Sequence, residues 1–163
     1  MNKSFVIALA AGLAAVAALV GIFFWSNLGS QVRLEASIVK TRIIPTDENS
    51  AVAVLEMRIN NPARVPFVIR TVTTRCYDAT GGLLSSDQVA EMDLDRVLEY
   101  NKLAGPRFNA VLRTKARLPG GEQHDWTVGA SFSSAAAKTL EGRRRFEVDL
   151  EDVDGVVVTV KER

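Results

Sequence analysis

The most pronounced hydrophobic pattern in the chain is a run of 21 residues at positions 5–25, which contains no charged residue and no proline. As an α-helix this run would be about 31 Å long, at roughly 1.5 Å per residue, which matches the ~30 Å hydrocarbon layer of a bilayer. It ends in Phe23, Phe24 and Trp25, which are aromatic residues suited to a membrane–water interface. The pattern predicts a single N-terminal transmembrane helix, with residues 1–30 as the anchor and 31–163 as the domain that it carries.

A cleavable signal peptide is the alternative for the same run, because Lys3 gives the chain a positively charged start. The apolar run is longer than the roughly 7–15 residues of a signal peptide, and the residues after it offer no convincing cleavage site. An uncleaved anchor is therefore favoured. Lys3 favours a cytoplasmic N-terminus, although Arg33 and Lys40 follow the run closely. The expected arrangement is a single-pass protein with an exported C-terminal domain, most simply in a bacterial inner membrane and facing the periplasm.

After residue 30 the pattern changes to short segments in which apolar and polar residues alternate, as in half-buried strands. Turn residues separate these segments, and the pair Ile43-Ile44 followed by Pro45 is expected to end the first strand. The expected strands cover residues 32–38, 51–59, 67–77, 108–116, 126–132, 146–150 and 156–160, with a short return strand beginning at 83–84. Apolar residues at helical spacing predict a helix over 87–103, capped by Ser86 or Asp87, or a loop with one or two helical turns. A second short helix is expected over 133–141.

Seven or eight short strands joined by Gly, Pro, Asn and Asp turns are typical of a mainly β protein. The predicted fold is an antiparallel, fibronectin- or immunoglobulin-like β-sandwich with one or two short helices. About 135 residues are enough for one such domain with its own core.

Charge and cysteine content narrow the functional classes. Lys3 is the only charged residue among the first 25, so the remainder holds 19 basic and 19 acidic residues. A neutral domain argues against nucleic-acid binding, which needs a basic face. Cys76 is the only cysteine and cannot form an internal disulfide, and its place in an expected strand predicts a buried or half-buried thiol.

No catalytic, metal or cofactor site is predicted. The acidic residues around Asp152 and Asp154 precede Gly155, but an EF-hand aligned on this glycine would put Leu150 and Lys161 at its first and last ligand positions. His124 is the only histidine, so it cannot build a His-based metal site, and a surface turn is its expected place. The glycine pairs do not precede a helix as a phosphate-binding loop requires. The expectation is a non-enzymatic protein without a cofactor.

Several turns resemble those of the late-embryogenesis-abundant type 2 (WHy) and FxLYD β-sandwich families. The resemblance rests on three features over residues 34–132: Asn61-Pro62 after an early strand, a Tyr77-Asp78-x-x-Gly81 hairpin, and Leu118-Pro119-Gly120 before Trp126. The chain departs from the pattern in the long segment 85–105. The resemblance implies a fibronectin-like sandwich that is often tethered to a membrane and usually lacks catalytic activity, and it implies no ligand.

Two surfaces are candidates for partner binding. Small residues at helical spacing in the anchor, Ala10, Ala14, Ala18 and also Gly21, permit close approach of another membrane helix, although an alanine-rich anchor shows such spacing by composition. The segment 85–107 interrupts the regular strands, and long connections often carry binding residues. Its candidates are Glu91, Asp95, Arg96, Glu99, Tyr100 and Arg107. Alternatively, this segment caps an open end of the sandwich, with Met92, Leu94, Val97 and Leu98 filling its core.

The favoured function is a membrane-anchored interaction module. It would bind or stabilise an integral membrane or envelope protein, as in an accessory subunit of a membrane complex, and would contact the bilayer through its N-terminal helix. The alternative is a tethered module that binds a lipid or small molecule in a cavity between the sheets. An enzyme ranks third, because no pair of residues has a spacing that argues for catalysis.

Overall fold

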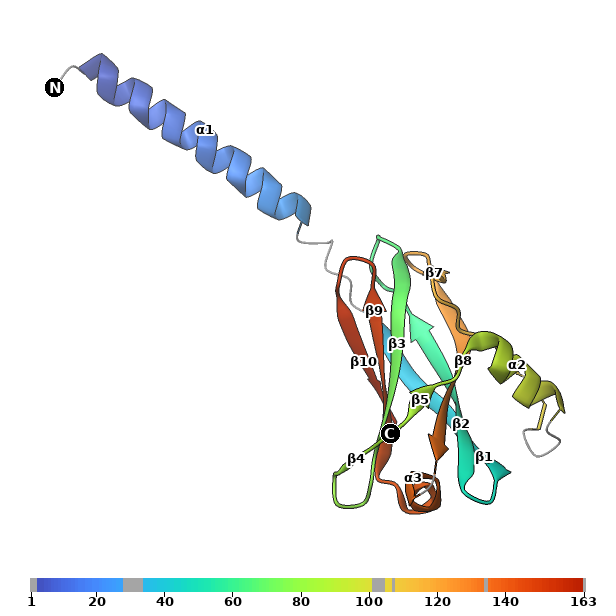
Figure 1. Ribbon diagram of the computed structural model, residues 1–163. Helices are drawn as coiled ribbons and strands as arrows, with labels where there is room; N and C mark the ends of the chain where they lie inside the picture. The colour runs from blue at the N-terminus through green and yellow to red at the C-terminus, as the bar shows by residue number, and fades with distance from the viewer. Residues whose placement is uncertain (1–2, 28–33, 101–104, 107, 134, 163) are drawn as a thin grey trace.

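The computed structural model describes residues 3–27, 34–100, 105–106, 108–133 and 135–162. The predicted N-terminal helix is present as α1 (Lys3–Asn27), which projects away from two stacked sheets (Figure 1). Side chains are described at positions 9, 11–23 and 25 of α1. Among the described residues no helix is long and apolar enough to qualify as a membrane span.

The first sheet is formed by three long antiparallel strands, β1 (Glu35–Asp47), β2 (Ser50–Asn60) and β8 (Gln123–Ser133), in this spatial order. Two short strands, β5 (Asp87–Gln88) and β6 (Ala110–Val111), occupy the other edge of β8. β6 runs parallel to β8, so the predicted antiparallel pattern has one exception.

The second sheet has the order β10 (Val157–Lys161), β9 (Arg145–Asp152) and β3 (Phe67–Tyr77), with all pairs antiparallel. Two short strands, β4 (Leu83–Leu84) and β7 (Arg117–Leu118), pair with the other edge of β3. The predicted mainly β sandwich is confirmed. Ten strands are described rather than seven or eight, and four of them are only two residues long.

The main core lies between the two sheets and follows the period-two pattern of the strands. Leu55, Met57 and Ile59 of β2 face Phe146 and its neighbours on β9, and all of these side chains are buried. Phe132 and Phe146 meet edge to face across the sheets, with ring centroids 6.1 Å apart. The alternating residues therefore build this core as the sequence predicted.

The outer face of the first sheet is covered by α2 (Glu91–Tyr100), which lies beside β8 in Figure 1. Leu94 and Leu98 of α2 pack in a second buried cluster with Ile44, Val52 and Val54. β2 is therefore buried on both faces, because its even-numbered valines contact the helix while its odd-numbered residues contact the main core. The alternative that this segment caps an open end of the sandwich is wrong about the place, because α2 covers a sheet face, but Leu94, Leu98 and in part Val97 do fill a core while Met92 does not.

The first strand does not end at Ile43-Ile44-Pro45, as the sequence suggested. β1 continues to Asp47, and Pro45 pairs with Ala51 of β2. Proline is tolerated because β1 is the edge strand of the sheet, where a missing N–H on the free side breaks no ladder, and because a register shift follows directly between Pro45 and Asp47.

The predicted strand over 108–116 is also wrong, since this segment crosses from one sheet to the other. It leaves β6 beside β8 and enters β7 beside β3. Lys115 has a positive φ of 66° in between, and its N–H donates to the Ile69 carbonyl at 2.7 Å. A left-handed residue turns the chain sharply, which the alternating side chains do not reveal.

The helix predicted over 87–103 begins later, at Glu91, and its described part ends at Tyr100. Ser86 and Asp87 do not cap it. The Ser86 hydroxyl donates to the Thr74 carbonyl at 3.0 Å, and Asp87 pairs with Ser131 of β8. The second predicted helix is confirmed as α3 (Ala135–Thr139) followed by the 3-10 turn η2 (Leu140–Gly142).

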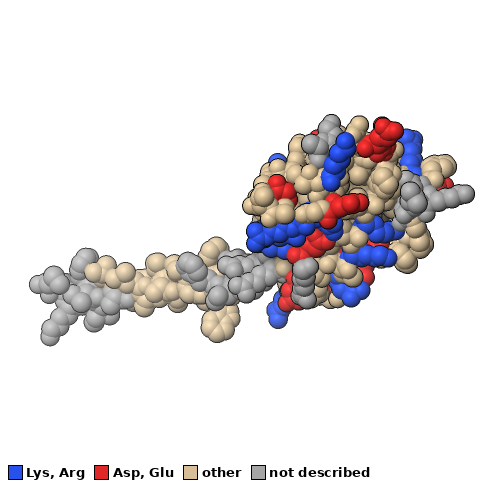
Figure 2. All heavy atoms as spheres, turned by 90° about the horizontal axis from the view of Figure 1, so that it is seen from below, with Lys and Arg blue, Asp and Glu red and all other residues tan. Residues whose placement is uncertain are grey.

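Charges of both signs are interspersed over the face of the sandwich seen in Figure 2, whereas the described part of α1 shows none. On the second sheet, Glu147 lies near three basic groups, those of Arg75, Arg145 and Lys161, at 3.6, 2.9 and 3.8 Å. Glu147 is itself buried, so this cluster places three basic groups around one buried carboxylate and does not form a basic face.

Candidate interaction surface

The α2 helix has one buried and one exposed side. Leu94 and Leu98 point into the second core, whereas Met92, Arg96 and Tyr100 follow one another at four-residue spacing on the other side. The side chains of Met92 and Tyr100 are 69% and 78% exposed. We call Met92, Arg96 and Tyr100 the α2 stripe. It combines a flexible apolar, a cationic and an aromatic side chain, which are residue types enriched in protein interfaces.

The segment that carries α2 is fixed to β8 at both ends. Before the helix, the Val89 N–H donates to the Gly129 carbonyl at 3.0 Å; after it, the Leu112 N–H donates to the Thr127 carbonyl at 2.8 Å. Gly129 also permits close packing, because a Cβ there would lie 2.7 Å from a methyl carbon of Leu94. The stripe is thus carried by a helix tied to the sheet, which limits the entropy lost on binding.

A part-buried ion pair between β1 and β2 holds the chain that follows α2. Arg42 of β1 donates to Glu56 Oε1 at 2.7 Å and to the Pro106 carbonyl at 3.2 Å, which ties the chain beyond α2 to the sheet. The Phe108 ring, 58% exposed, lies 4.8 Å from Lys40 Nζ and 5.7 Å from Arg42 Cζ. Phe108 begins the expected strand over 108–116, but it lies outside β6 and its side chain is at the surface.

The predicted partner-binding residues fall into two separate groups. Asp95, Arg96, Glu99 and Tyr100 all lie on α2, where Asp95 is half-buried and the other three are exposed. Glu91 begins α2 and Ala10 lies in α1, but their side chains are outside the described set, as is the whole of Arg107. The remaining candidates, Ala14, Ala18 and Gly21, are exposed on α1. The structure groups the α2 residues and places the α1 residues on a different helix (Figure 1).

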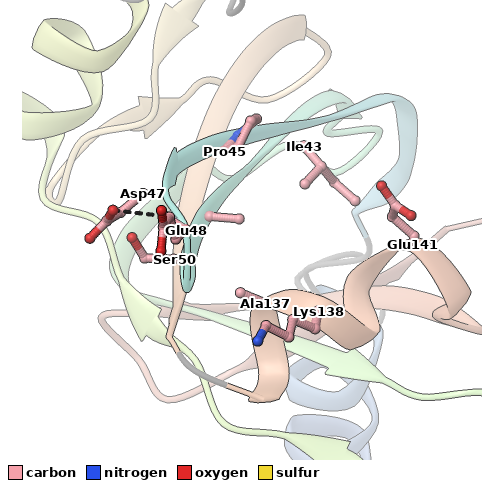
Figure 3. A pocket seen from close by; sticks show the side chains of 9 residues that line it. Ile43, Pro45, Asp47, Glu48, Ser50, Ala137, Lys138 and Glu141 are labelled. Carbon is pink, nitrogen blue, oxygen red and sulfur yellow. Dashed lines mark hydrogen bonds between the residues drawn. The ribbon is translucent and has the colours of Figure 1, made fainter.

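A hollow of about 380 Å³ lies where the β1–β2 hairpin meets α3 (Figure 3). Ile43, Pro45, Ala51 and Ala137 supply an apolar part, and the polar rim is formed by Asp47, Glu48, Ser50, Lys138 and Glu141. Its volume lies within the range of small-molecule sites, roughly 300–1,000 Å³. Nothing in its geometry resembles an activated nucleophile or an acid–base pair.

His124 and Asp152 have structural roles, and His124 lies in β8 rather than in the expected turn. His124 stacks on Trp126, with ring centroids 5.4 Å apart, and its Nε2 lies 2.9 Å from Glu122. Asp152 is buried, and its Oδ1 accepts the N–H groups of Val68 and Val153 at 2.9 and 2.7 Å. Within the described ranges no group of three or more His, Cys, Asp or Glu residues could hold a metal ion.

Cys76 is buried in β3, and burial raises the pKa of its thiol to about 11. The neighbouring carboxylates of Glu162 and Asp78 act in the same direction, and Arg143 opposes them. A nucleophilic cysteine needs a lowered pKa and access to solvent. This thiol has neither property, so it is a core residue.

The two packed sheets and the outer helix define the chain as a mainly β sandwich with one covered sheet. No protein-family model matches it, and no curated protein matches it. Among solved structures, it is similar to the X-ray structure of Northeast Structural Genomics Consortium target SoR45, with 15% identity and a TM-score of 0.41 over 83% of this chain and 85% of that chain. At this identity and TM-score the similarity assigns neither a family nor a function.

Sequence reasoning missed the Arg42–Glu56 pair, exposed Phe108 and the basic residues of the crossover between β6 and β7. Arg42 and Glu56 lie at ordinary positions of two alternating strands, and their contact depends on the register of β1 against β2, which places Lys40 opposite Glu56 and Arg42 opposite Val54. The proline and glycine at positions 105–106 were the available sign that the pattern after them need not be a regular strand.

Proposed function

We propose that this protein is a non-enzymatic, membrane-anchored β-sandwich that binds or stabilises a protein partner, as an accessory subunit of a membrane complex. α1 would hold the sandwich at the membrane, with the N-terminus in the cytoplasm and the sandwich exported to the periplasm of a bacterial cell. The α2 stripe with Phe108 would contact the partner. The resemblance to the late-embryogenesis-abundant type 2 and FxLYD families supports this role, because it implies a sandwich that is often tethered to a membrane and usually lacks catalytic activity.

The observation that carries the proposal is the surface of α1. Its described large side chains are exposed and apolar, among them Leu13 at 64%, Leu19 at 68% and Trp25 at 82%. A helix that is hydrophobic all round requires an apolar environment, which is either a protein core or a bilayer. The complete run at residues 5–25 has the length of a bilayer's hydrocarbon layer, and its end in Phe23, Phe24 and Trp25 suits the interface.

The anchor is tested with the full chain in bacterial membranes. We expect the protein to stay in the membrane fraction after alkaline carbonate extraction and to float with lipid in a density gradient. Alkaline phosphatase fused after the last residue should be active, because that enzyme folds only after export. Release of the sandwich by carbonate, or a shortened mature chain that begins after residue 25, would contradict the anchor.

Partner binding is tested separately by photo-cross-linking in intact membranes. A cross-linker placed at Met92 should capture a discrete partner, and the double variant Arg96→Glu/Tyr100→Ser should abolish this product. The matched control is Leu83→Ser/Arg144→Glu, which also replaces one exposed apolar and one exposed arginine residue but lies away from α2. Equal products from both double variants would contradict the α2 stripe as the contact surface.

A lipid- or small-molecule-binding module is the second candidate, and the hollow at α3 favours it because of its volume and its apolar part. Native mass spectrometry of the chain released from detergent distinguishes the two functions. A bound small molecule that is lost in Ala137→Trp, together with an absence of cross-linked partner, would support the second candidate against the first.

A further inference from the structure

The sandwich has two ends, and the pairing of the strands identifies the one nearer to α1. β1 begins at Glu35, and Glu35 pairs with Asn60, which in turn pairs with Gln123. The loops 61–66 and 119–122 therefore lie at the end where β1 begins, which we call the proximal end. The β1–β2 hairpin and α3 lie at the opposite, distal end (Figure 1).

The chain length keeps the proximal end close to α1. Asn27 ends α1 and Glu35 begins β1, so eight residue steps separate them. At most about 3.5 Å per residue, these steps span no more than roughly 28 Å. β2 has 11 residues, so the distal end is about another 35 Å away at ~3.3 Å per residue.

The crossover between β6 and β7 places cationic side chains at this end. Arg113, Lys115 and Arg117 are all exposed, and we call these three residues the basic crossover. The Lys115 N–H bonds to Ile69 near the start of β3, and Arg117 pairs with Val68. The crossover therefore lies beside the first residues of β3, at the proximal end.

A hollow of about 310 Å³ accompanies the basic crossover. It is lined by Arg113 and Lys115, by one hydroxyl residue, Thr114, and by an apolar set, Ala110, Val111, Ala116 and Trp126, with no acidic residue in the lining. This differs from the distal hollow, whose rim holds three carboxylates and one lysine. A cationic rim above an apolar floor with an indole ring matches the headgroup region of an anionic bilayer.

The proximal end carries other charges besides the basic crossover, among them the exposed side chains of Arg64 in the 61–66 loop and Glu122 in the 119–122 loop. Arg70 lies 3.5 Å from Glu151, and Glu35 accepts a hydrogen bond from Asn60 at 3.1 Å. Asp154 is exposed in the β9–β10 turn, next to the exposed side chain of Val153. Asp154 opposes attraction to an anionic surface, which makes it a useful internal test.

We propose that the basic crossover docks the proximal end of the sandwich onto anionic headgroups of the bilayer that holds α1. This inference rests on the membrane anchor proposed above. Docking fixes the orientation of the sandwich, so the α2 stripe, on a helix that packs over the distal half of the first sheet, is held away from the membrane surface rather than left free to rotate on a tether. The anchor supplies proximity, and the basic crossover supplies attraction that depends on lipid charge and salt.

The test uses the full chain reconstituted in vesicles with and without about one-third phosphatidylglycerol. A fluorophore is attached at Val156→Cys in the proximal β9–β10 turn, or at Asn49→Cys in the distal hairpin. The native thiol is buried and unreactive, so each variant is labelled at one position. Lipids with a nitroxide on the headgroup quench a label that lies at the membrane surface. We expect strong quenching at Val156 in anionic vesicles, several-fold less in neutral vesicles or at 0.5 M salt, and little at Asn49 throughout.

Charge variants identify the residues responsible. Lys115→Gln/Arg117→Gln should reduce quenching at position 156 by at least threefold, whereas the distal control Lys138→Gln/Arg144→Gln removes the same charge and should leave it unchanged. Asp154→Asn should increase the quenching at position 156, because it removes a negative charge from the proximal end. Quenching that is insensitive to lipid charge and to the crossover variant overturns the proposal.

Co-flotation of the same vesicles separates this failure from failure of the anchor. A chain that floats but shows no quenching at position 156 overturns docking alone, and it points to a protein or solvent at this end. A chain that does not float overturns the anchor and, with it, the docking.

Discussion

The side chain of Asn61 offers the sharpest test of how this fold is held together. Asn61 is fully buried, and its Nδ2 donates to the carbonyls of Val65, Leu118 and Pro119 at 2.9, 3.1 and 3.2 Å. Its Oδ1 accepts the Ala63 N–H at 3.1 Å. One amide thus joins the β2–β3 loop to the β7–β8 loop, and Asn61→Ala removes all four contacts without adding bulk.

The magnitude follows from the number of bonds that an amide can make. Nδ2 has two hydrogens, so the three carbonyls share two bonds, and the bond to Oδ1 makes a third. At about 1 kcal/mol net for each bond, Asn61→Ala should lower the free energy of unfolding by about 3 kcal/mol. Asn61→Asp should cost more, because it points carboxylate oxygens instead of donors at the carbonyls in a buried site. For a domain of this size, 3 kcal/mol corresponds to a decrease in Tm of roughly 10 °C.

The measurement is thermal and urea unfolding of the full chain in detergent micelles, followed by near-UV circular dichroism. The neighbouring Asn60 is the matched control. Its amide makes one exposed bond, to Glu35 Oε2 at 3.1 Å, so Asn60→Ala should cost less than about 1 kcal/mol. Equal losses for Asn60→Ala and Asn61→Ala, or an Asn61→Asp variant as stable as Asn61→Ala, would refute this account of the loop contact.

Three further predictions concern other parts of the sandwich. Gly120→Ala should lower the free energy of unfolding by roughly 2–3 kcal/mol, because its Cβ would lie 2.5 Å from a backbone carbonyl oxygen. Gly121→Ala has open space around its Cβ but a φ of +77°, so it should lower the free energy of unfolding by only about 1 kcal/mol, and equal losses in urea unfolding would contradict this. Arg42→Met should lower the free energy of unfolding by roughly 3 kcal/mol, because it leaves the Glu56 carboxylate unpaired. Arg42→Met/Glu56→Leu should recover more than half of that loss, and a double variant no more stable than the single variant in urea unfolding would contradict this account. The pKa of the Cys76 thiol rises from 9.0 to about 11 on folding, so stability should fall as pH increases from about 9 towards 11, and Cys76→Ala should remove that decrease in pH-dependent unfolding curves.

Much of the fold could be predicted because apolar residues recur at every second position along its strands. In β2, residues Leu55, Met57 and Ile59 alternate with polar ones, and this period fixes which face meets the main core. The turn at Asp78 could be predicted for a similar reason. Its carboxylate accepts bonds from Thr80 and from the Gly82 N–H, which also hold its pKa below the ordinary value. Such interactions are local, so adjacent residues determine them.

The crossover and the start of α2 could not be predicted, because distant residues decide them. The segment after Pro106 alternates like a strand, yet it divides between β8 and β3, since each sheet has a free edge there. Ser86 resembles a helix cap, but its hydroxyl bonds to the Thr74 carbonyl on β3 instead. In each case a long-range hydrogen bond outweighs a local preference that differs by a fraction of a kcal/mol.

The sequence by itself determined the apolar helix, the neutral strand-rich domain and the turns at Asn61, Asp78 and Gly120, because periodicity and backbone chemistry act over a few residues. Only the tertiary structure decided that α2 covers the outer face of the first sheet and exposes Met92 and Tyr100. It also decided that the chain crosses between sheets at Lys115, which puts cationic side chains at the proximal end. These features depend on which distant surfaces meet, and the free energy of burying those surfaces is not encoded in any single segment.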